Sequence, residues 1–251
     1  MQHGALRNAY LDALGIDRWV PRNAPAEVVQ EPVVAPRAEV PAQVQVPAAP
    51  ARQAPPVVPL EPGIDWGPLR ERVATCTACE LCKTRTQTVF GVGNTQAEWL
   101  VIGEAPGAEE DRQGEPFVGR AGQLLNAMLL AIGLPRETVF IANILKCRPP
   151  GNRDPRPEEV ARCLPFLHAQ IALLKPKVIL VVGRIAAQTL LATDAPLARL
   201  RGKLHAFGEA HTPLVITYHP AYLLRTPADK RKAWEDLKFA RATYHKLAGV
   251  N

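Results

Sequence analysis

The sequence predicts an α/β fold in which helices cover both faces of a parallel sheet of four strands. Four short apolar runs have the composition of buried strands. Each run is followed by a segment with helical spacing, and this alternation is typical of parallel sheets because the chain needs a crossover to return in the same direction. The predicted strands span residues 99–102, 138–145, 178–182 and 214–218.

Start and stop signals predict the helices that lie between and around these strands. Pro157 is placed to begin a helix, and Gly133 is placed to end one. The predicted helices are a first one that carries Trp66, Leu69 and Val73, followed by residues 121–132, 157–174, 183–191 and 227–247.

Proline separates an N-terminal extension from the folded domain. Of the 25 prolines, 11 fall between residues 21 and 62, and no aromatic residue lies between Trp19 and Trp66. This composition predicts a disordered linker with polyproline II character over residues 23–63. The folded domain is therefore expected over residues 64–251.

The first 22 residues form a separate short peptide in this prediction. Leu6, Tyr10, Leu11 and Leu14 recur near helical spacing, and so short an amphipathic helix cannot bury its apolar face alone. The peptide resembles the N-terminal segment by which the psi subunit of bacterial replicase docks on the clamp loader. We expect it either to bind a replication or clamp-loader protein or to pack on the chain's own domain.

Charge and cysteine usage restrict the class of protein. The formal net charge of +6 over 251 residues suits a polyanionic partner such as nucleic acid. No apolar run approaches the roughly 18 residues of a membrane span, and no secretory signal is visible. An odd number of cysteines, five, argues against a secreted disulfide framework. We expect a monomer in the reducing bacterial cytoplasm, with no membrane partner.

A glycine-rich loop follows the first predicted strand. It contains two glycines, three acids and one aromatic residue, namely Gly103, Gly107, Glu109, Glu110, Asp111 and Phe117. Ligands of open α/β sheets bind in the crevice beyond the strand ends. The loop is therefore interpreted as a pocket wall, and the alternative is a tight connection with solvated acids.

Four cysteines have the arrangement of a metal site. Cys76 and Cys79 are separated by two residues, a spacing that lets one turn aim two thiolates at a metal, and Cys147 and Cys163 are separated by fifteen. Zinc and an iron–sulfur cluster both fit four thiolates, and spacing alone does not separate them. Cys82 is an extra thiol. The alternative is that the cysteines are buried free thiols, which suits Cys163 on an apolar helix face.

Several sequence blocks occur together in one order: Val89-Phe-Gly-Val-Gly93, Gly103-Glu-Ala-Pro-Gly107, Pro116-Phe-Val-Gly-Arg-Ala-Gly-Gln-Leu-Leu125, Asn143-Ile-Leu-Lys-Cys-Arg-Pro-Pro-Gly-Asn-Arg153 and Tyr218-His-Pro-Ala-Tyr-Leu-Leu-Arg225. With the cysteine pair, this region resembles the family 4 uracil-DNA glycosylases, the iron–sulfur branch of their superfamily. The resemblance implies a three-layer α/β/α fold with a four-stranded parallel sheet. It implies a [4Fe–4S] cluster on Cys76, Cys79, Cys147 and Cys163. It also implies hydrolysis of the N-glycosidic bond of deoxyuridine in DNA, which releases uracil and leaves an abasic site for base excision repair.

The same resemblance assigns roles in the pocket. Phe117 matches the aromatic residue that stacks on the base, and a carboxamide at Asn143 pairs with uracil O4 and N3–H while rejecting the pattern of cytosine. His219 stabilises the negative charge that grows on the departing base. Gly103 and Ala105 are expected to contact the base. Where the family 1 enzymes have a water-orienting aspartate this chain has Ala105, so Glu104 is the first candidate for a catalytic carboxylate and Glu110 the second.

DNA contacts are expected from cations and from an apolar wedge. The candidate cations are Lys146, Arg148, Arg153, Arg201, Lys203 and Arg225. Leu223 or Leu224 is expected to enter the gap that an extruded base leaves, or to pack on a helix.

Two alternatives have other chemistry. One is a superfamily member that binds uracil-DNA tightly or covalently, with His205 in a region that looks too short for that branch. The other is a DNA-binding replisome adaptor without catalysis. The joint presence of Phe117, Asn143 and His219 argues against a purely structural role.

Overall fold

The computed structural model describes residues 63–249, and the predictions for residues 1–22 and 23–62 lie outside the described residues. Its helices are α2 (Trp66–Ala74), α3 (Ala108–Gln113), α4 (Arg120–Ala131), α5 (Pro157–Leu174), α6 (Arg184–Leu191), α7 (Leu197–Leu200), α8 (Pro220–Arg225) and α9 (Lys230–Ala248). Short 3-10 turns are η1 (Glu80–Lys83), η2 (Arg136–Thr138), η3 (Pro150–Asn152) and η4 (Pro227–Asp229). Within this part of the chain, no helix has the length and apolar character needed to cross a membrane.

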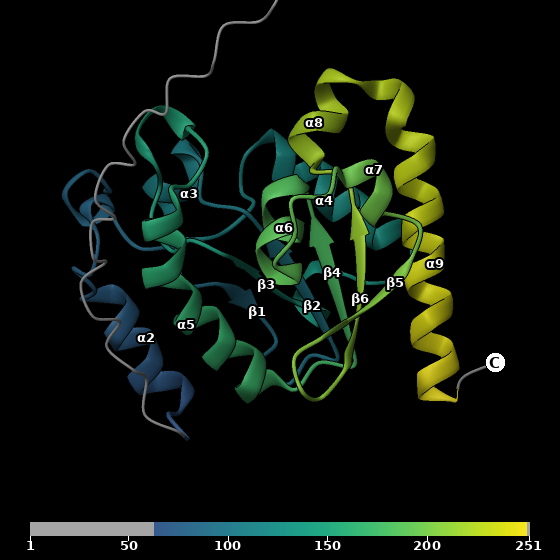
Figure 1. Ribbon diagram of the computed structural model, residues 1–251, viewed down its shortest axis with the longest axis horizontal. Helices are drawn as coiled ribbons and strands as arrows, with labels where there is room; N and C mark the ends of the chain where they lie inside the picture. The colour runs from purple at the N-terminus through teal and green to yellow at the C-terminus, as the bar shows by residue number, and fades with distance from the viewer. Residues whose placement is uncertain (1–62, 250–251) are drawn as a thin grey trace, which may run out of the picture. The chain divides into compact units, whose positions relative to one another are not determined.

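The sheet has six strands in the order β1-β3-β2-β4-β6-β5, and not the four that the sequence predicts (Figure 1). The central four are parallel and correspond to the predicted strands: β2 (Trp99–Gly103), β3 (Phe140–Asn143), β4 (Val178–Val182) and β6 (Thr212–Thr217). The two extra strands, β1 (Val92–Gly93) and β5 (Leu204–Phe207), pair antiparallel at the two edges. The prediction of a parallel sheet is confirmed for the centre, and its strand number is wrong.

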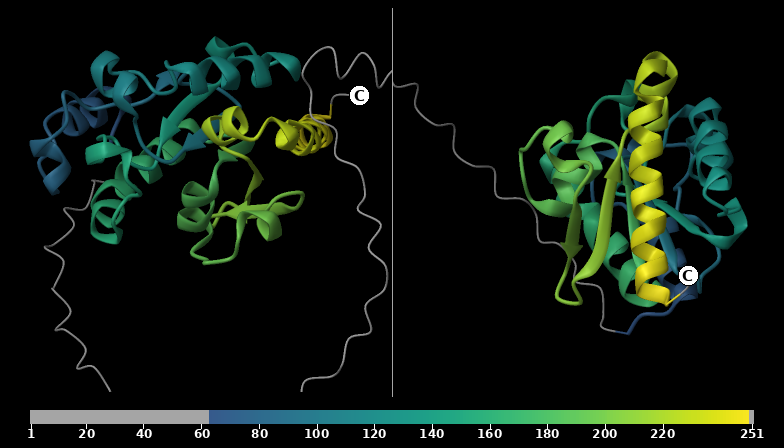
Figure 2. Two further views of the ribbon diagram at one scale, coloured as in Figure 1. Left: turned by 90° about the horizontal axis from the view of Figure 1, so that it is seen from above. Right: turned by 90° about the vertical axis from the view of Figure 1, so that its right-hand side faces the viewer.

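Helices cover both faces of the sheet, as predicted. On one face, Leu100, Ile102 and Ile179 pack with buried residues of α2, α5 and α6. On the other face, Val101 and Leu180 pack with buried residues of α4 and α9. The view from above shows α5 and α6 on one side of the sheet and α4 and α9 on the other (Figure 2). Strands β2 and β4 are buried along their whole length because they lie between two helical layers, which explains their unbroken apolar sequences.

The parallel strands all end at one edge of the sheet. Gly103 and Asn143 are the last residues of neighbouring strands and pair directly with one another. Thr217 ends β6, and the chain then enters α8 through Tyr218 and His219. This arrangement brings three separate sequence blocks to one place, which is where open α/β sheets bind their ligands.

Candidate functional site

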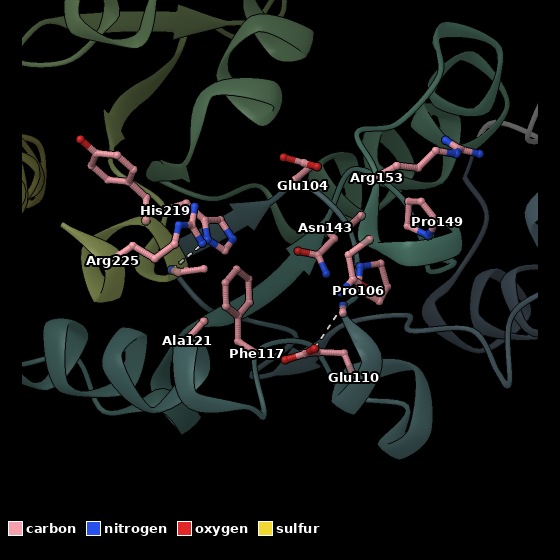
Figure 3. Close-up of a pocket in the computed structure, with 15 residues that line it drawn as sticks. Glu104, Pro106, Glu110, Phe117, Ala121, Asn143, Pro149, Arg153, His219 and Arg225 are labelled. Carbon is pink, nitrogen blue, oxygen red and sulfur yellow. Dashed lines mark hydrogen bonds between the residues drawn. The ribbon is translucent and has the colours of Figure 1, made fainter.

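A cavity of about 410 Å³ lies at this edge of the sheet. Its lining includes most of the pocket residues predicted from the sequence: Glu104, Ala105, Glu110, Phe117, Asn143 and His219. Figure 3 shows the Phe117 ring and the Asn143 carboxamide pointing into the same space, with His219 on one side and Glu104 on another. The pocket-wall interpretation of the glycine-rich loop therefore agrees with the structure.

Phe117 stands on a strained backbone. Its φ of 55° lies in the left-handed region, which costs a bulky side chain free energy unless the surroundings hold it there. Arg136 does so, because its guanidinium donates hydrogen bonds to the Pro116 carbonyl at 2.6 Å and to the Phe117 carbonyl at 3.3 Å. The ring centroid of Phe117 lies 5.6 Å from that of His219. The aromatic ring is thus fixed beside the imidazole before any ligand enters.

Asn143 offers an unused hydrogen-bonding group. The residue is 2 % exposed, and its Oδ1 atom is buried with no partner among the described residues. Buried polar atoms are nearly always paired, so such an atom in a pocket lining is suited to a ligand. Gly103 makes room for it, since a Cβ atom there would lie 2.4 Å from Asn143 Oδ1 and 2.6 Å from the Phe117 ring.

His219 is held as a neutral imidazole. It caps the N-terminus of α8, where its Nδ1 accepts a hydrogen bond from the backbone N–H of Ala221 at 3.1 Å (Figure 3). The pKa of His219 is lowered to about 4, chiefly by burial and also by the positive charge of Arg225, while Glu110 opposes the shift. Because Nδ1 is an acceptor, the proton of the neutral ring is on Nε2, which leaves Nε2 as a donor.

Glu104 carries an unusual carboxylate. The pKa of Glu104 is raised to about 7, chiefly by burial and also by nearby Asp154, while Arg184 opposes the rise. Asp154 and Arg184 form an ion pair of 3.0 Å with each other, so the charge of Arg184 is partly neutralised. A carboxylate with this pKa exchanges a proton near neutral pH, which is the property of a general base.

The carboxylate of Glu110 is occupied by the backbone. Oε2 accepts a hydrogen bond from Gly107 N at 3.1 Å, and Oε1 accepts from Val118 N at 3.0 Å and Gly119 N at 3.2 Å. These bonds join the loop after β2 to the loop that carries Phe117. Glu110 lines the cavity as predicted, but the contacts favour a loop-holding role over a catalytic one.

The predicted DNA-contacting cations differ in how far they are engaged. Arg225 lines the cavity, Lys203 is exposed, and Arg148 Nε is bonded to Asn152 Oδ1 at 2.7 Å. Arg153 also lines the cavity, but it pairs with buried Glu159 at 2.5 Å. Two other cations are engaged inside the fold, since Lys146 is 1 % exposed and Arg201 pairs with buried Asp236 at 2.6 Å. Neither of these is free to reach a phosphate.

Of the two leucines considered as a wedge, Leu223 has the position of the alternative, packing on helices. Leu223 is 1 % exposed and belongs to the apolar cluster under α4 and α9, because it lies on the inner face of α8. The neighbouring Leu224 is 37 % exposed and is the residue able to enter a gap in a DNA stack.

Five cysteines gather around a second cavity between α2, the loop after β3 and α5. Cys76, Cys79, Cys82, Cys147 and Cys163 all line it, and all five are free thiols. Burial raises the pKa of Cys147 to about 11 and of Cys163 to about 12, so without a cationic partner these thiols stay protonated. In the part of the chain that the structure describes, no three His, Cys, Asp or Glu side chains converge closely enough to hold one metal ion.

The lining of this second cavity suits an anionic occupant. A [4Fe–4S] cluster would take one thiolate for each of its four irons. Donors surround the thiols: Arg85 Nη1 lies 3.0 Å from Cys147 Sγ, and the backbone N–H of Lys146 lies 3.1 Å from Cys163 Sγ. Arg162 also lines the cavity, and its buried Nη2 has no partner among residues 63–249.

Sequence reasoning missed several residues of both cavities. Arg136 supports Phe117 from a turn nineteen positions away, and Arg85 and Arg162 approach the cysteines from separate segments. Isolated arginines carry no spacing signal, so only the fold identifies them. Tyr222, which lines the first cavity, follows the His-Pro pair by two positions and was within reach of motif reasoning.

A stacking ring, a free carboxamide and a neutral imidazole around one cavity define a site for a planar heterocyclic base. The model of the Uracil DNA glycosylase superfamily matches residues 90–238, and the chain belongs to this superfamily.

Three of the similar relatives are named type-4 uracil-DNA glycosylases. The type-4 uracil-DNA glycosylase of Archaeoglobus fulgidus is 44 % identical over 66 % of this chain and 86 % of its own length. The type-4 enzyme of Pyrobaculum aerophilum is 43 % identical over 69 % of this chain and 92 % of its own. That of Thermotoga maritima is also 43 % identical, over 68 % and 91 %.

Proposed function

We propose that this protein is a DNA glycosylase that hydrolyses the N-glycosidic bond of deoxyuridine in DNA, releasing uracil and leaving an abasic site. The observation that carries the proposal is the convergence of Phe117, Asn143 and His219 on one cavity beside the strand ends. Type-4 uracil-DNA glycosylases at 43–44 % identity support the same activity. The reaction belongs to the excision repair of uracil in DNA.

Recognition begins when the target nucleotide leaves the base stack and enters the cavity. Phe117 stacks on the flat face of the base. Because Arg136 already holds its strained backbone, binding costs little conformational entropy at this residue. The Asn143 carboxamide donates to uracil O4 and accepts from N3–H. Cytosine presents the reverse pattern, which leaves the buried carboxamide unpaired and disfavours binding.

Bond cleavage places positive charge on the sugar and negative charge on the departing base. His219 Nε2–H donates to the oxygen of uracil on which that negative charge collects. The neutral ring suits this role, because it stabilises the anion without giving up its proton in the ground state. A side chain at Gly103 would collide with Asn143 Oδ1 and the Phe117 ring, so glycine there leaves both groups in place for the base.

Glu104 orients and deprotonates the attacking water. Its carboxylate borders the cavity, and a pKa of about 7 leaves a large fraction ionised at neutral pH. The oxocarbenium-like sugar needs only a weakly activated nucleophile. Glu104 therefore contributes mainly by placing the water and accepting its proton.

The test is incubation of the protein with an oligonucleotide that contains one uracil, followed by alkali. We expect strand cleavage at the uracil and release of the free base. An intact strand with tight binding contradicts the enzyme and favours the adaptor alternative. A protein–DNA adduct that survives alkali contradicts hydrolysis and favours the covalent binder.

The second cavity is proposed to hold a [4Fe–4S] cluster on Cys76, Cys79, Cys147 and Cys163. When bound, the cluster supplies covalent cross-links that fix α2, the loop after β3 and α5 to one another. The unpaired Arg162 and the donors to Cys147 and Cys163 support an anionic occupant. We expect iron, sulfide and absorption near about 400 nm in the purified protein. Zinc without iron would contradict the cluster.

DNA binding is proposed to use Arg148, Arg153 and Arg225 at the mouth of the cavity, with Leu224 as the wedge. The monomeric state, the cytoplasmic location and a replication partner for residues 1–22 stay predictions.

A further inference from the structure

Lys146 is a buried cation that the proposed mechanism does not use. It is 1 % exposed and lies in the short segment between Asn143, in the first cavity, and Cys147, in the second. Burying an ammonium group costs several kcal/mol unless its charge and its hydrogen bonds are compensated. Its contacts therefore need a physical explanation.

The side chain of Lys146 turns back to its own strand end. Nζ donates to the backbone carbonyl of Asn143 at 2.9 Å and to Gln170 Oε1 of α5 at 2.6 Å. Gln170 is itself fixed, because its Nε2 donates to the Phe90 carbonyl at 2.9 Å. The ammonium group thus ties the backbone of Asn143 to α5.

Two hydrogen bonds also fix the backbone that follows Asn143. Ile144 N donates to the Gly103 carbonyl at 2.9 Å, and Leu145 N donates to the Glu104 carbonyl at 3.0 Å. Together with the Lys146 contact, these bonds set how far the Asn143 carboxamide reaches into the cavity. Without Lys146, the Asn143 carbonyl at the end of β3 would lose its side-chain donor.

The groups that act electrostatically on the Lys146 ammonium are the thiols of Cys163 and Cys147, and no carboxylate of the described residues is among them. The backbone N–H of Lys146 also donates to Cys163 Sγ at 3.1 Å, and the residue lines the cysteine cavity. Four thiolates around a [4Fe–4S] core leave that site with net negative charge. A loaded cysteine site therefore supplies the anion that a buried ammonium group requires.

We propose that Lys146 is a positioning residue through which the loaded cysteine site holds the Asn143 carboxamide in place for base recognition. The proposal rests on the proposed role of Asn143 as the reader of uracil. In this proposal the cysteine site contributes to the recognition of uracil, in addition to cross-linking three segments of the chain.

The experiment compares binding of two DNA duplexes to cluster-loaded protein. One duplex carries 2′-fluoro-2′-deoxyuridine, which resists cleavage, and the other carries a tetrahydrofuran abasic analogue with no base. We expect Lys146→Met to weaken binding of the uracil duplex about tenfold, the cost of one hydrogen bond to a charged group, and to leave the abasic duplex unchanged. Lys246→Met, which changes an exposed lysine of α9, is the matched control. Iron content and visible absorption are measured on each variant.

Equal loss on both duplexes, or no loss with the cluster intact, would overturn the proposal. If Lys146→Met does not fold or does not retain iron, Gln170→Met is the deciding variant. It removes one hydrogen-bond partner of Lys146 Nζ and keeps the positive charge of Lys146. The same selective loss for the uracil duplex supports the proposal, and equal or absent loss overturns it.

A double-mutant cycle separates this proposal from the role of Asn143. If Lys146 acts through Asn143, Lys146→Met has no further effect on uracil binding in the Asn143→Ala background. Additive losses contradict the positioning role. If Asn143→Ala alone leaves uracil binding unchanged, the reader role fails, whatever Lys146 does.

Discussion

At the scale of single residues, burial affects the two ionisable groups proposed to act in catalysis in opposite directions. Burial disfavours the charged form of both, so it raises the pKa of the Glu104 carboxyl to about 7 and lowers the pKa of the His219 imidazole to about 4. At neutral pH the pocket therefore holds a partly ionised base and an uncharged donor. This combination suits a reaction that consumes water and expels an anion.

The rate should follow the ionisation of Glu104. Only the carboxylate accepts a proton, so kcat/KM is expected to rise with pH up to about 7 and then to level off, with His219 neutral throughout. Glu104→Gln should lower kcat about 100-fold and remove this dependence. A pH–rate profile of both proteins makes the measurement, and an unchanged profile in the variant would exclude Glu104 as the base.

The raised pKa of Glu104, which favours its action as a base, makes the folded protein less stable at neutral pH. The folded protein holds the proton of Glu104 more tightly than the unfolded chain, whose pKa is near 4.5. Glu104 therefore lowers the free energy of unfolding as the pH rises from about 4.5 to about 7. Denaturant unfolding of Glu104→Gln across this range should show a smaller decline than the wild type.

Asn143→Asp should reverse the selectivity of the pocket. A carboxylate only accepts hydrogen bonds, so it repels uracil O4 and suits the amino group of cytosine. We expect at least about a tenfold loss of kcat/KM on uracil and a gain of detectable cytosine release. Unchanged rates on both bases would remove Asn143 from the reader role.

At the scale of elements, the central strands were predictable and the edge strands were not. Strand β4 was predicted with its observed bounds, Val178–Val182, because burial on both faces makes its sequence continuously apolar. The two edge strands give no such signal. Strand β1 has only two residues, Val92–Gly93, and β5, Leu204–Phe207, alternates exposed and half-buried positions. Backbone pairing, rather than side-chain burial, defines them.

In the pocket, too, single residues could be predicted from the sequence but their partners could not. Asn143 was identifiable because it is a polar residue that interrupts the predicted apolar strand 138–145, and the structure buries it in the cavity. The acid at position 110 was identifiable as important, but its three backbone partners come from loops whose approach depends on the whole fold. Lys146 was predicted to contact DNA, and its burial depends on a partner from a separate element, Gln170 of α5.

Substitution of Glu110 tests whether the loop after β2 and the loop that carries Phe117 act as one unit. A glutamine keeps a single acceptor oxygen and turns an NH₂ group toward a backbone N–H, so Glu110→Gln should lower the free energy of unfolding by about 2 kcal/mol. It should also lower kcat/KM while leaving the pH dependence set by Glu104 intact. Glu109→Gln is the control, because Glu109 pairs only with Arg112 and Gln113 on the surface. Loss of the pH dependence in Glu110→Gln would instead make Glu110 the base.

At the scale of the whole molecule, everything that the proposed reaction needs lies within the described residues. The sheet, both cavities and the Lys146 connection belong to residues 63–249, and the match to the superfamily begins at residue 90. Residues 1–60 contain five arginines and five acidic residues, so they add no net charge to the +6 of the chain. The net positive charge that would attract DNA therefore belongs to residues 61–251.

Deleting residues 1–60 is expected to leave uracil excision on a short oligonucleotide within about twofold of the full chain, because neither the pocket nor the charge that attracts phosphate is removed. The measurement is kcat/KM at several salt concentrations, and we expect both proteins to lose affinity with the same slope as salt rises. A domain variant, Arg225→Ala, serves as the comparison and should reduce that slope, since it removes a cation at the mouth of the cavity. A large loss on deletion, or a smaller slope in the deleted protein, would show that the extension contacts DNA or supports the pocket directly.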